Sequence, residues 1–166
     1  MKLCGSIIIL AASFLFARTR LRERKQEIET LSSLCTALEH MHAKLAASLM
    51  PLPELTAQLS RDSRGEVANF FAQVNGDILD VEFRQNWRSA VENRLRRLQP
   101  EDRRTVMDLG DWLGRYTLQE QLTALERSCA ALCDSRDHQR KKYTEERKLS
   151  YGLSAAVGIF LAIMLA

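Results

Sequence analysis

Four side chains of this sequence are of types that bind zinc, and they form two pairs at helical spacing. Cys129 and Cys133 are four residues apart, and Cys35 and His42 are seven residues apart, so each pair lies on one face of a helix. If the two helices pack antiparallel, all four side chains could converge on one zinc ion. We favour the alternative, in which the cysteines are small apolar residues of a packing seam, because no CxxC pair supports the metal. We therefore expect no metal and no cofactor.

Motifs for other catalytic chemistry are missing from the sequence. There is no GxxxxGK[ST] phosphate-binding loop and no GxSxG nucleophile turn. No cysteine falls at an expected helix start, where its pKa would be lowered. We therefore expect a protein that is not an enzyme.

The elements that position these residues are framed by two uncharged, apolar segments. Leu3–Ala17 and Leu149–Ala166 contain no Asp, Glu, Lys, Arg or His. We expect an N-terminal membrane anchor over residues 1–17, a soluble domain over 18–148 and a C-terminal transmembrane helix over 149–166. A cleaved signal peptide is the alternative for the first segment, but no small-x-small cleavage site precedes Arg18.

Positive charges indicate how these segments are oriented. Basic residues cluster on the inner flanks, in Arg18–Lys25 and Lys141–Lys148, whereas Lys2 is the only basic side chain outside the domain. The positive-inside rule then predicts a cytoplasmic domain at the cell membrane, with reduced cysteines. The 21 acidic residues all lie within the domain, interspersed with its basic residues, so we expect no nucleic-acid partner.

The domain is predicted to be an all-α antiparallel bundle of about six helices, because the apolar periodicity is helical and no alternating strand pattern occurs. The first and last helices are expected to be long and to continue into the membrane spans. Their apolar seams consist of Ile28, Leu31, Cys35, Leu38, His42, Leu45 and Leu49 in the first, and Leu118, Leu122, Leu125, Cys129 and Leu132 in the last. The stretch Asp134–Lys148 lacks such a seam and should be a solvated stalk.

Shorter helices are delimited by proline and glycine. Pro51 ends the first helix, and Pro53 is expected to open the second at its first helical position. Further expected features are a break at Ser63–Gly65, an apolar face of Val67, Phe70, Phe71 and Val74 that ends in a left-handed cap at Asn75-Gly76, and a helix from Val81 to Leu98. Pro100 should start the next helix. It is expected to bury Val106, Leu109 and either Leu113 or Trp112. Trp87 and Trp112 are both interpreted as core residues and not as ligand-stacking platforms.

The segment Leu109–Gln121 carries the strongest local signals. Gly110 lies inside a helix, where glycine is unfavourable, which suggests close packing of a neighbouring backbone. Gly114 is expected to end that helix in a left-handed conformation. Thr117 and Glu120 form a capping box that starts the last helix. We expect this turn to fix the angle between the bundle and its C-terminal stalk.

Small residues in the C-terminal segment could mark a contact face between helices in the membrane. Gly152 and Ala156 are four residues apart, as are Ser154 and Gly158. Such spacing allows helix backbones to approach closely in lipid.

Taken in order, these features resemble the stage III sporulation protein AB family of endospore-forming bacteria over the whole length. The resemblance is carried by the PLPEL stretch at Pro51–Leu55, FRQNWRSAV with Trp87, and LGDWLGRYTLQEQ at Leu109–Gln121. An apolar N-terminus, the aromatic pair Phe70-Phe71 and a basic stalk before the last span complete the pattern.

The resemblance implies a helical domain similar to the cytoplasmic F domain of type II secretion and pilus systems. It also implies a membrane platform in the mother-cell half of a channel between mother cell and forespore. The implied partners are other stage III sporulation channel proteins, including a secretion-type ATPase, with a homo-oligomer as a further possibility. The implied location is the mother-cell side of the outer forespore membrane. A platform piece of a type II secretion or pilus system, and a metal-binding or redox membrane enzyme, are the alternatives.

Overall fold

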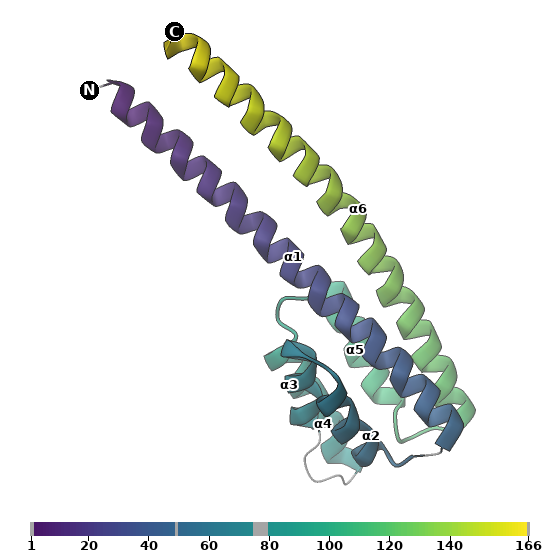
Figure 1. Ribbon diagram of the computed structural model, residues 1–166. Helices are drawn as coiled ribbons and strands as arrows, with labels where there is room; N and C mark the ends of the chain where they lie inside the picture. The colour runs from purple at the N-terminus through teal and green to yellow at the C-terminus, as the bar shows by residue number, and fades with distance from the viewer. Residues whose placement is uncertain (1, 49, 75–79, 166) are drawn as a thin grey trace. The chain divides into compact units, whose positions relative to one another are not determined.

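The computed structural model describes residues 2–48, 50–74 and 80–165, with side chains described for 18–48, 50–74 and 82–148. The described residues form six helices and no strand. They are α1 (Lys2–Ser48), α2 (Leu52–Asp62), α3 (Gly65–Val74), α4 (Asp80–Arg94), α5 (Pro100–Trp112) and α6 (Leu118–Leu165) (Figure 1). The predicted all-helical class is therefore confirmed.

The chain divides into two compact units. The bundle unit spans Glu27–Asp137, and the end unit combines Met1–Gln26 with His138–Ala166. In the end unit the backbone is helical from Lys2 and up to Leu165. The side chains of the two expected membrane segments, Gly152 and Ala156 included, lie outside the described residues. Among the residues that were searched, the described ones, no helix is both long enough and apolar enough to cross a membrane.

Within the bundle unit, α1 and α6 run antiparallel. The thiol of Cys133 contacts the Glu39 carboxylate at 3.8 Å. Cys133 also lies close enough to Cys35 to raise its pKa, and the Glu39 carboxylate lies close enough to Cys129 to raise the pKa of that thiol. Moving forward along α1 thus corresponds to moving backward along α6, so the chain enters and leaves the bundle at the same end. The shorter helices pack in sequence, α2 on α3, α3 on α4 and α4 on α5.

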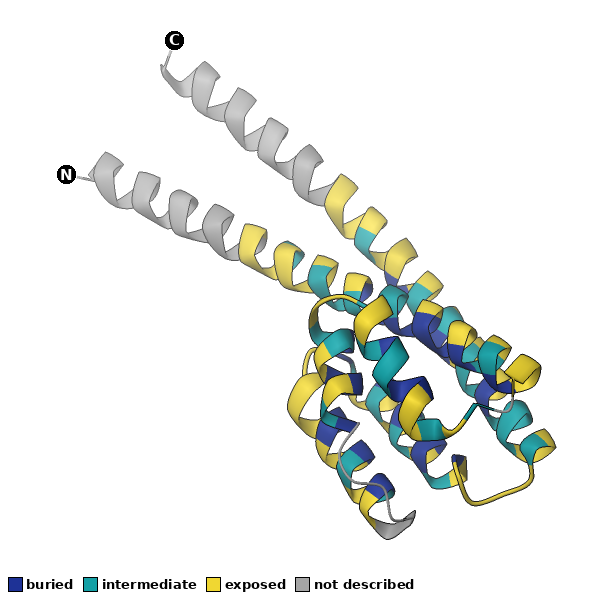
Figure 2. Cartoon of the chain, turned by 60° about the horizontal axis from the view of Figure 1, so that its bottom comes forward, coloured by how far each residue is buried: buried dark blue, intermediate teal, exposed yellow. Residues whose placement is uncertain are grey.

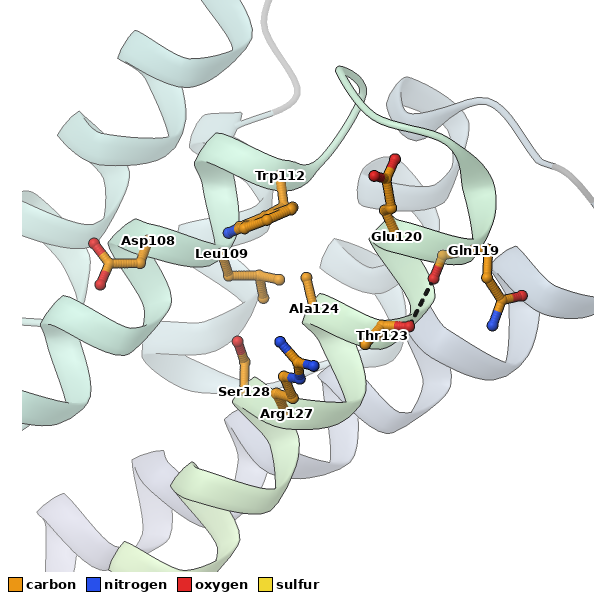
Figure 3. Close-up of a pocket in the computed structure, with 9 residues that line it drawn as sticks. All are labelled: Asp108, Leu109, Trp112, Gln119, Glu120, Thr123, Ala124, Arg127 and Ser128. Carbon is orange, nitrogen blue, oxygen red and sulfur yellow. Dashed lines mark hydrogen bonds between the residues drawn. The ribbon is translucent and has the colours of Figure 1, made fainter.

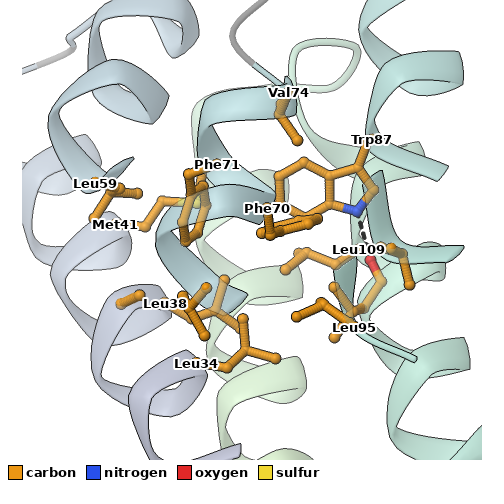
Figure 4. Packing of buried hydrophobic residues seen from close by; sticks show 14 of the residues in the cluster. Leu34, Leu38, Met41, Leu59, Phe70, Phe71, Val74, Trp87, Leu95 and Leu109 are labelled. Atoms are coloured by element: carbon orange, nitrogen blue, oxygen red, sulfur yellow. Dashed lines mark hydrogen bonds between the residues drawn. The ribbon is translucent and has the colours of Figure 1, made fainter. Parts of the chain in front are cut away.

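The core lies where these helices meet (Figure 2). Its centre is aromatic: the Trp87 ring packs edge-on against Phe70, with ring centroids 4.9 Å apart, and Phe71 packs edge-on against Phe70 at 4.8 Å (Figure 4). Such edge-to-face pairs contribute about 0.5–1.5 kcal/mol beyond the area that they bury. The predicted core role of Trp87 and of the α3 face is confirmed, since Val67, Phe70, Phe71 and Val74 are all buried.

The buried face of α1 is wider than the predicted seam. Leu34, Ala37 and Met41 are buried in addition to Leu31, Cys35 and Leu38. The reason is that α1 contacts two neighbours, the shorter helices and α6, so it needs more than a two-per-heptad stripe. His42, a predicted seam residue, is only partly buried, and Leu49 lies outside the described residues.

Two predicted boundaries differ from those in the structure, and a third lies outside the described residues. Helix α4 ends at Arg94 and not at Leu98; Leu95 and Leu98 are nevertheless buried, because the turn that follows bonds back, from the Leu98 amide to the Leu95 carbonyl at 3.1 Å. Helix α2 begins at Leu52, so Pro53 is its second residue and Pro51 its N-cap. The expected left-handed cap at residues 75–76 lies outside the described residues.

Candidate interaction site at the α5–α6 junction

The turn between α5 and α6 is built from local signals that the sequence contains. Helix α5 ends at Trp112, Leu113 follows in an extended conformation, and Gly114 has a φ of 77°. A residue with a Cβ is disfavoured in this left-handed region by about 1–2 kcal/mol. The predicted conformation of Gly114 is confirmed, and it turns the chain from α5 toward α6.

The predicted capping box at the start of α6 is also confirmed. The Thr117 amide donates to the Glu120 carboxylate at 3.0 Å, and the Glu120 amide donates to the Thr117 hydroxyl at 3.4 Å. The Thr117 hydroxyl in turn donates to the Glu120 carboxylate at 2.7 Å. These hydrogen bonds lower the pKa of Glu120 below its ordinary value of 4.5. The carboxylate is thereby tied to the start of the helix.

Gln121 adds a second brace that sequence reasoning missed. Its side-chain amide donates to the Tyr116 carbonyl at 2.7 Å and accepts from the Gly114 amide at 3.1 Å. One side chain thus holds two backbone groups of the turn. The only sign of this role in the sequence is a glutamine four residues after Thr117. Standard capping motifs have no residue at that spacing, so the pattern does not predict these hydrogen bonds.

Gly110 packs against the indole of Trp87, and not against a backbone as predicted. A Cβ added at this position would lie 2.6 Å from Cγ and 2.7 Å from Nε1 of that ring, where no methyl group fits. The same indole Nε1–H donates to the Val106 carbonyl at 2.7 Å (Figure 4). The glycine therefore allows α5 to approach α4 closely enough for this buried hydrogen bond.

Trp112 is not a core residue, which corrects the prediction. It is 41% exposed and stacks on Tyr116, also 41% exposed, with ring centroids 4.7 Å apart. The guanidinium of Arg115 lies 5.8 Å from the centroid of the Tyr116 ring. The inward position at this end of α5 is taken by Leu113, which is buried, and the adjacent indole is left at the surface.

Trp112 borders a groove of about 360 Å³ between α5 and α6. The groove is lined by Asp108, Leu109 and Trp112 from α5, and by Gln119, Glu120, Thr123, Ala124, Arg127 and Ser128 from α6 (Figure 3). An aromatic face beside aliphatic side chains, with charged groups around it, has the composition of a protein contact site.

The three cysteines whose side chains the structure describes lie together between α1 and α6. Burial raises the pKa of Cys35 well above its ordinary value, and the neighbouring Cys133 raises it further. Burial also raises the pKa of Cys129 to about 11. No set of three His, Cys, Asp or Glu side chains among the described residues is arranged to hold a metal ion.

The remaining predicted site residues occupy structural positions. Pro51 is exposed, and its carbonyl accepts from the Leu55 amide at 3.0 Å, which starts α2. Pro53, also exposed, belongs to the first turn of that helix.

The chain matches the family described as stage III sporulation protein AB over residues 2–166. The chain belongs to this family. A solved structure titled stage III sporulation protein AB (SpoIIIAB) superposes on it with a TM-score of 0.61 at 14% sequence identity. The match covers 72% of this chain and 97% of the other, and at that identity it shows a shared fold. A comparison with curated proteins finds no match.

Proposed function

We propose that this member of the sporulation protein AB family is a non-enzymatic membrane platform of a secretion-like channel complex between mother cell and forespore. The observation that carries the proposal is the geometry of the bundle ends. Chain entry near Glu27 and exit near Asp137 lie at one end of an antiparallel pair. From Glu27 toward the N-terminus, and from Asp137 toward the C-terminus, the helix continues into an uncharged apolar segment. Two such segments leaving one end suit insertion into a single membrane.

In this proposal the bundle faces the cytoplasm on the mother-cell side of the outer forespore membrane. The basic flanks Arg18–Lys25 and Lys141–Lys148 support this orientation. The small-residue pair Gly152 and Ala156 is a proposed contact between helices within the membrane. Homo-oligomerisation is compatible with this arrangement.

The α5–α6 groove is the proposed contact surface for the secretion-type ATPase of the complex. The two large apolar side chains that stay exposed among the described residues, Trp112 and Tyr116, lie at this one junction. Exposed aromatic anchors are the residues that most often dominate interface energies. The turn that carries them is fixed by Gly114, the capping box and Gln121, so the surface is preorganised.

Two measurements test the platform. Reporter fusions after Lys148 should be active with a cytoplasmic reporter and inactive with one that works only outside the cytoplasm. Affinity purification from sporulating cells, followed by mass spectrometry, should recover the ATPase and the other stage III channel proteins. Recovery of the protein in the soluble fraction without these partners would contradict the proposal.

A pair of variants tests the groove. Trp112→Ala should reduce recovery of the ATPase at least about tenfold, since interface anchors contribute about 2 kcal/mol or more. Tyr143→Ala removes an aromatic ring of α6 outside the groove and should leave recovery unchanged. Equal recovery in both variants, at equal protein levels, would exclude the groove as the contact.

The alternative of a metal-dependent or redox enzyme has no supporting geometry among the described residues. No group of three His, Cys, Asp or Glu side chains among them could hold a metal ion, and the raised pKa values of Cys35 and Cys129 oppose thiolate chemistry. The pilus or type II secretion alternative has no observation that favours it over the sporulation family.

A further inference from the structure

Two thiols from the two long helices lie against each other within the bundle unit. Cys35 of α1 is fully buried in the core, and Cys133 of α6 is partly buried against the same core. The Cys133 thiol is a hydrogen-bond partner of the Cys35 thiol. It also contacts the carboxylate of Glu39 at 3.8 Å, and Glu39 lies one helical turn after Cys35 on the same face of α1. Both contacts place Cys133 directly across from Cys35.

A third thiol, that of Cys129, lies nearby but is badly placed to bond with Cys133. The two residues are four apart on α6, which is continuous through both. Residues at this spacing have Cβ atoms about 5–6 Å apart, whereas a disulfide requires about 3.5–4.5 Å. A bond between them would therefore distort the helix. Thiols on different helices are free of this limit, so Cys35 is the better partner for Cys133.

The two facing thiols differ in their access to solvent. Cys35 is buried, and burial raises the pKa of its thiol well above the ordinary value, so it contains little of the reactive thiolate. Cys133 is only partly buried. Its sulfur lies beside the Glu39 carboxylate, which opposes a thiolate, and near the guanidinium of Arg136, which favours one. A small reagent from solvent therefore reaches Cys133 before Cys35.

We propose that Cys133 is a thiol-modification site and that Cys35 converts the modified thiol into a disulfide between α1 and α6. The reagent is a small-molecule disulfide of the oxidised glutathione class. The inference concerns the bundle unit alone and does not depend on the proposed membrane anchoring.

The reaction has two thiol–disulfide exchange steps. In the first, the Cys133 sulfur attacks one sulfur of the reagent, the S–S bond of the reagent breaks, and a mixed disulfide forms while one small thiol leaves with the Cys133 proton. In the second, the Cys35 sulfur attacks the Cys133 sulfur and displaces the second small thiol, which leaves with the Cys35 proton. The two protein thiols are thus oxidised by two electrons, and the reagent is reduced to two thiols.

The contact between the two thiols compensates for the burial of Cys35. The second step is intramolecular, so a thiol already beside its target reacts at a high effective concentration and needs only a small thiolate fraction. The resulting disulfide would close a loop of about 100 residues, which includes most of the bundle unit. Crosslinks that close long loops restrict the unfolded chain, so the oxidised bundle should be more stable than the reduced one.

The test uses the full-length protein, purified in detergent under reducing conditions and then treated with oxidised glutathione. Trypsin digestion without reduction separates the thiols, because residues 26–44 contain Cys35 alone and residues 128–136 contain Cys129 and Cys133. Mass spectrometry with fragmentation should find these two peptides joined through Cys35 and Cys133. Oxidation should also raise the melting temperature by several degrees, and dithiothreitol should reverse this shift.

Matched alanine variants assign the two roles. Cys133→Ala should abolish both the mixed disulfide and the joined peptides. Cys35→Ala should stop the reaction after its first step and leave at least about tenfold more mixed disulfide at Cys133 than the parent retains. Cys129→Ala removes the neighbouring thiol of the same helix and should leave the joined peptides unchanged. Melting of the reduced variants checks the fold; if Cys35→Ala does not fold, the two variants at partly buried positions still decide the question.

Three results would overturn the proposal. A disulfide within residues 128–136 of the folded parent would show that Cys129 is the partner of Cys133. Equal amounts of mixed disulfide in the parent and in Cys35→Ala would show that Cys35 does not attack the modified thiol. Absence of any adduct or crosslink in the folded protein would show that the cysteines are only small apolar residues of the packing seam.

Discussion

Substituting Gly110 by alanine sets local helix preference against tertiary packing. Alanine is favoured over glycine inside a helix by about 1 kcal/mol, so local preference predicts stabilisation. The structure predicts the opposite, because the new methyl group would fall on the Trp87 ring, 2.7 Å from its Nε1. Trp87 is fully buried between Phe70 and Phe83, so the indole has no free space to occupy.

The magnitude follows from three contributions. Forcing a methyl group into a packed core costs about 1–3 kcal/mol. Displacing the indole breaks its 2.7 Å hydrogen bond to the Val106 carbonyl and leaves a buried donor unsatisfied, at a cost of about 1–3 kcal/mol. The helix preference of alanine offsets about 1 kcal/mol. Gly110→Ala should therefore lower the free energy of unfolding by about 3 kcal/mol, within a range of about 1–5 kcal/mol.

The assay is urea unfolding of the fragment 18–148, followed by far-ultraviolet circular dichroism. The fragment is expected to be soluble and helical, and its spectrum is recorded first. The control is a double-mutant cycle with Trp87→Leu, which removes the ring that the methyl group would strike. In that background Gly110→Ala should be neutral or stabilising by up to about 1 kcal/mol. Stability equal to or above that of the parent for the single variant would refute the proposed contact.

Three further predictions concern the turn and the thiols. The double variant Gly114→Val with Thr117→Ala should lower the free energy of unfolding by about 2 kcal/mol in the same assay. The valine would place a Cβ on a residue with a φ of 77°, and the alanine would remove the hydroxyl that caps α6. An unchanged free energy of unfolding would contradict the role assigned to this turn. The pKa of Glu120 is lowered in the folded state, so its stabilising contribution is complete above pH 4.5 and is lost as the pH falls through the lower folded pKa. Acid unfolding of Glu120→Gln should therefore show a weaker pH dependence than the parent, and identical curves would exclude the linkage. Cys35 and Cys129 should react slowly with iodoacetamide at about pH 8, because burial raises the pKa of both thiols, that of Cys129 to about 11. Rapid labelling of the native protein, measured by peptide mass spectrometry, would contradict their burial.

Boundaries set by local chemistry were predictable, and those set by packing were not. Gly114 and the Thr117–Glu120 capping box form hydrogen bonds and turns within a few residues of themselves. The local sequence is therefore sufficient to predict where α5 ends and where α6 begins. The end of α4 was predicted four residues too late. Leu95 and Leu98 continue the apolar pattern and are buried, but they reach the core from a turn, which periodicity alone does not distinguish from a helix.

Sequence patterns point to the segment Leu109–Gln121 but do not specify which neighbours its residues contact. The segment around Gly110 was singled out, yet its neighbour is a side chain from another helix. Helical periodicity leaves the inward position at the end of α5 open between Leu113 and Trp112. Only the packed helices show that Leu113 takes the inward position and leaves Trp112 beside the groove.

The sequence by itself determined the helical class, the uncharged ends, the basic flanks and the caps, because each depends on composition or on hydrogen bonds between near neighbours. Tertiary structure alone decided which residues meet across helices. It placed Cys133 beside Glu39, Trp87 against Gly110, and Arg97 with Glu66 beside Thr30. These contacts depend on how the described helices pack around one core, and no local pattern in the chain specifies that packing.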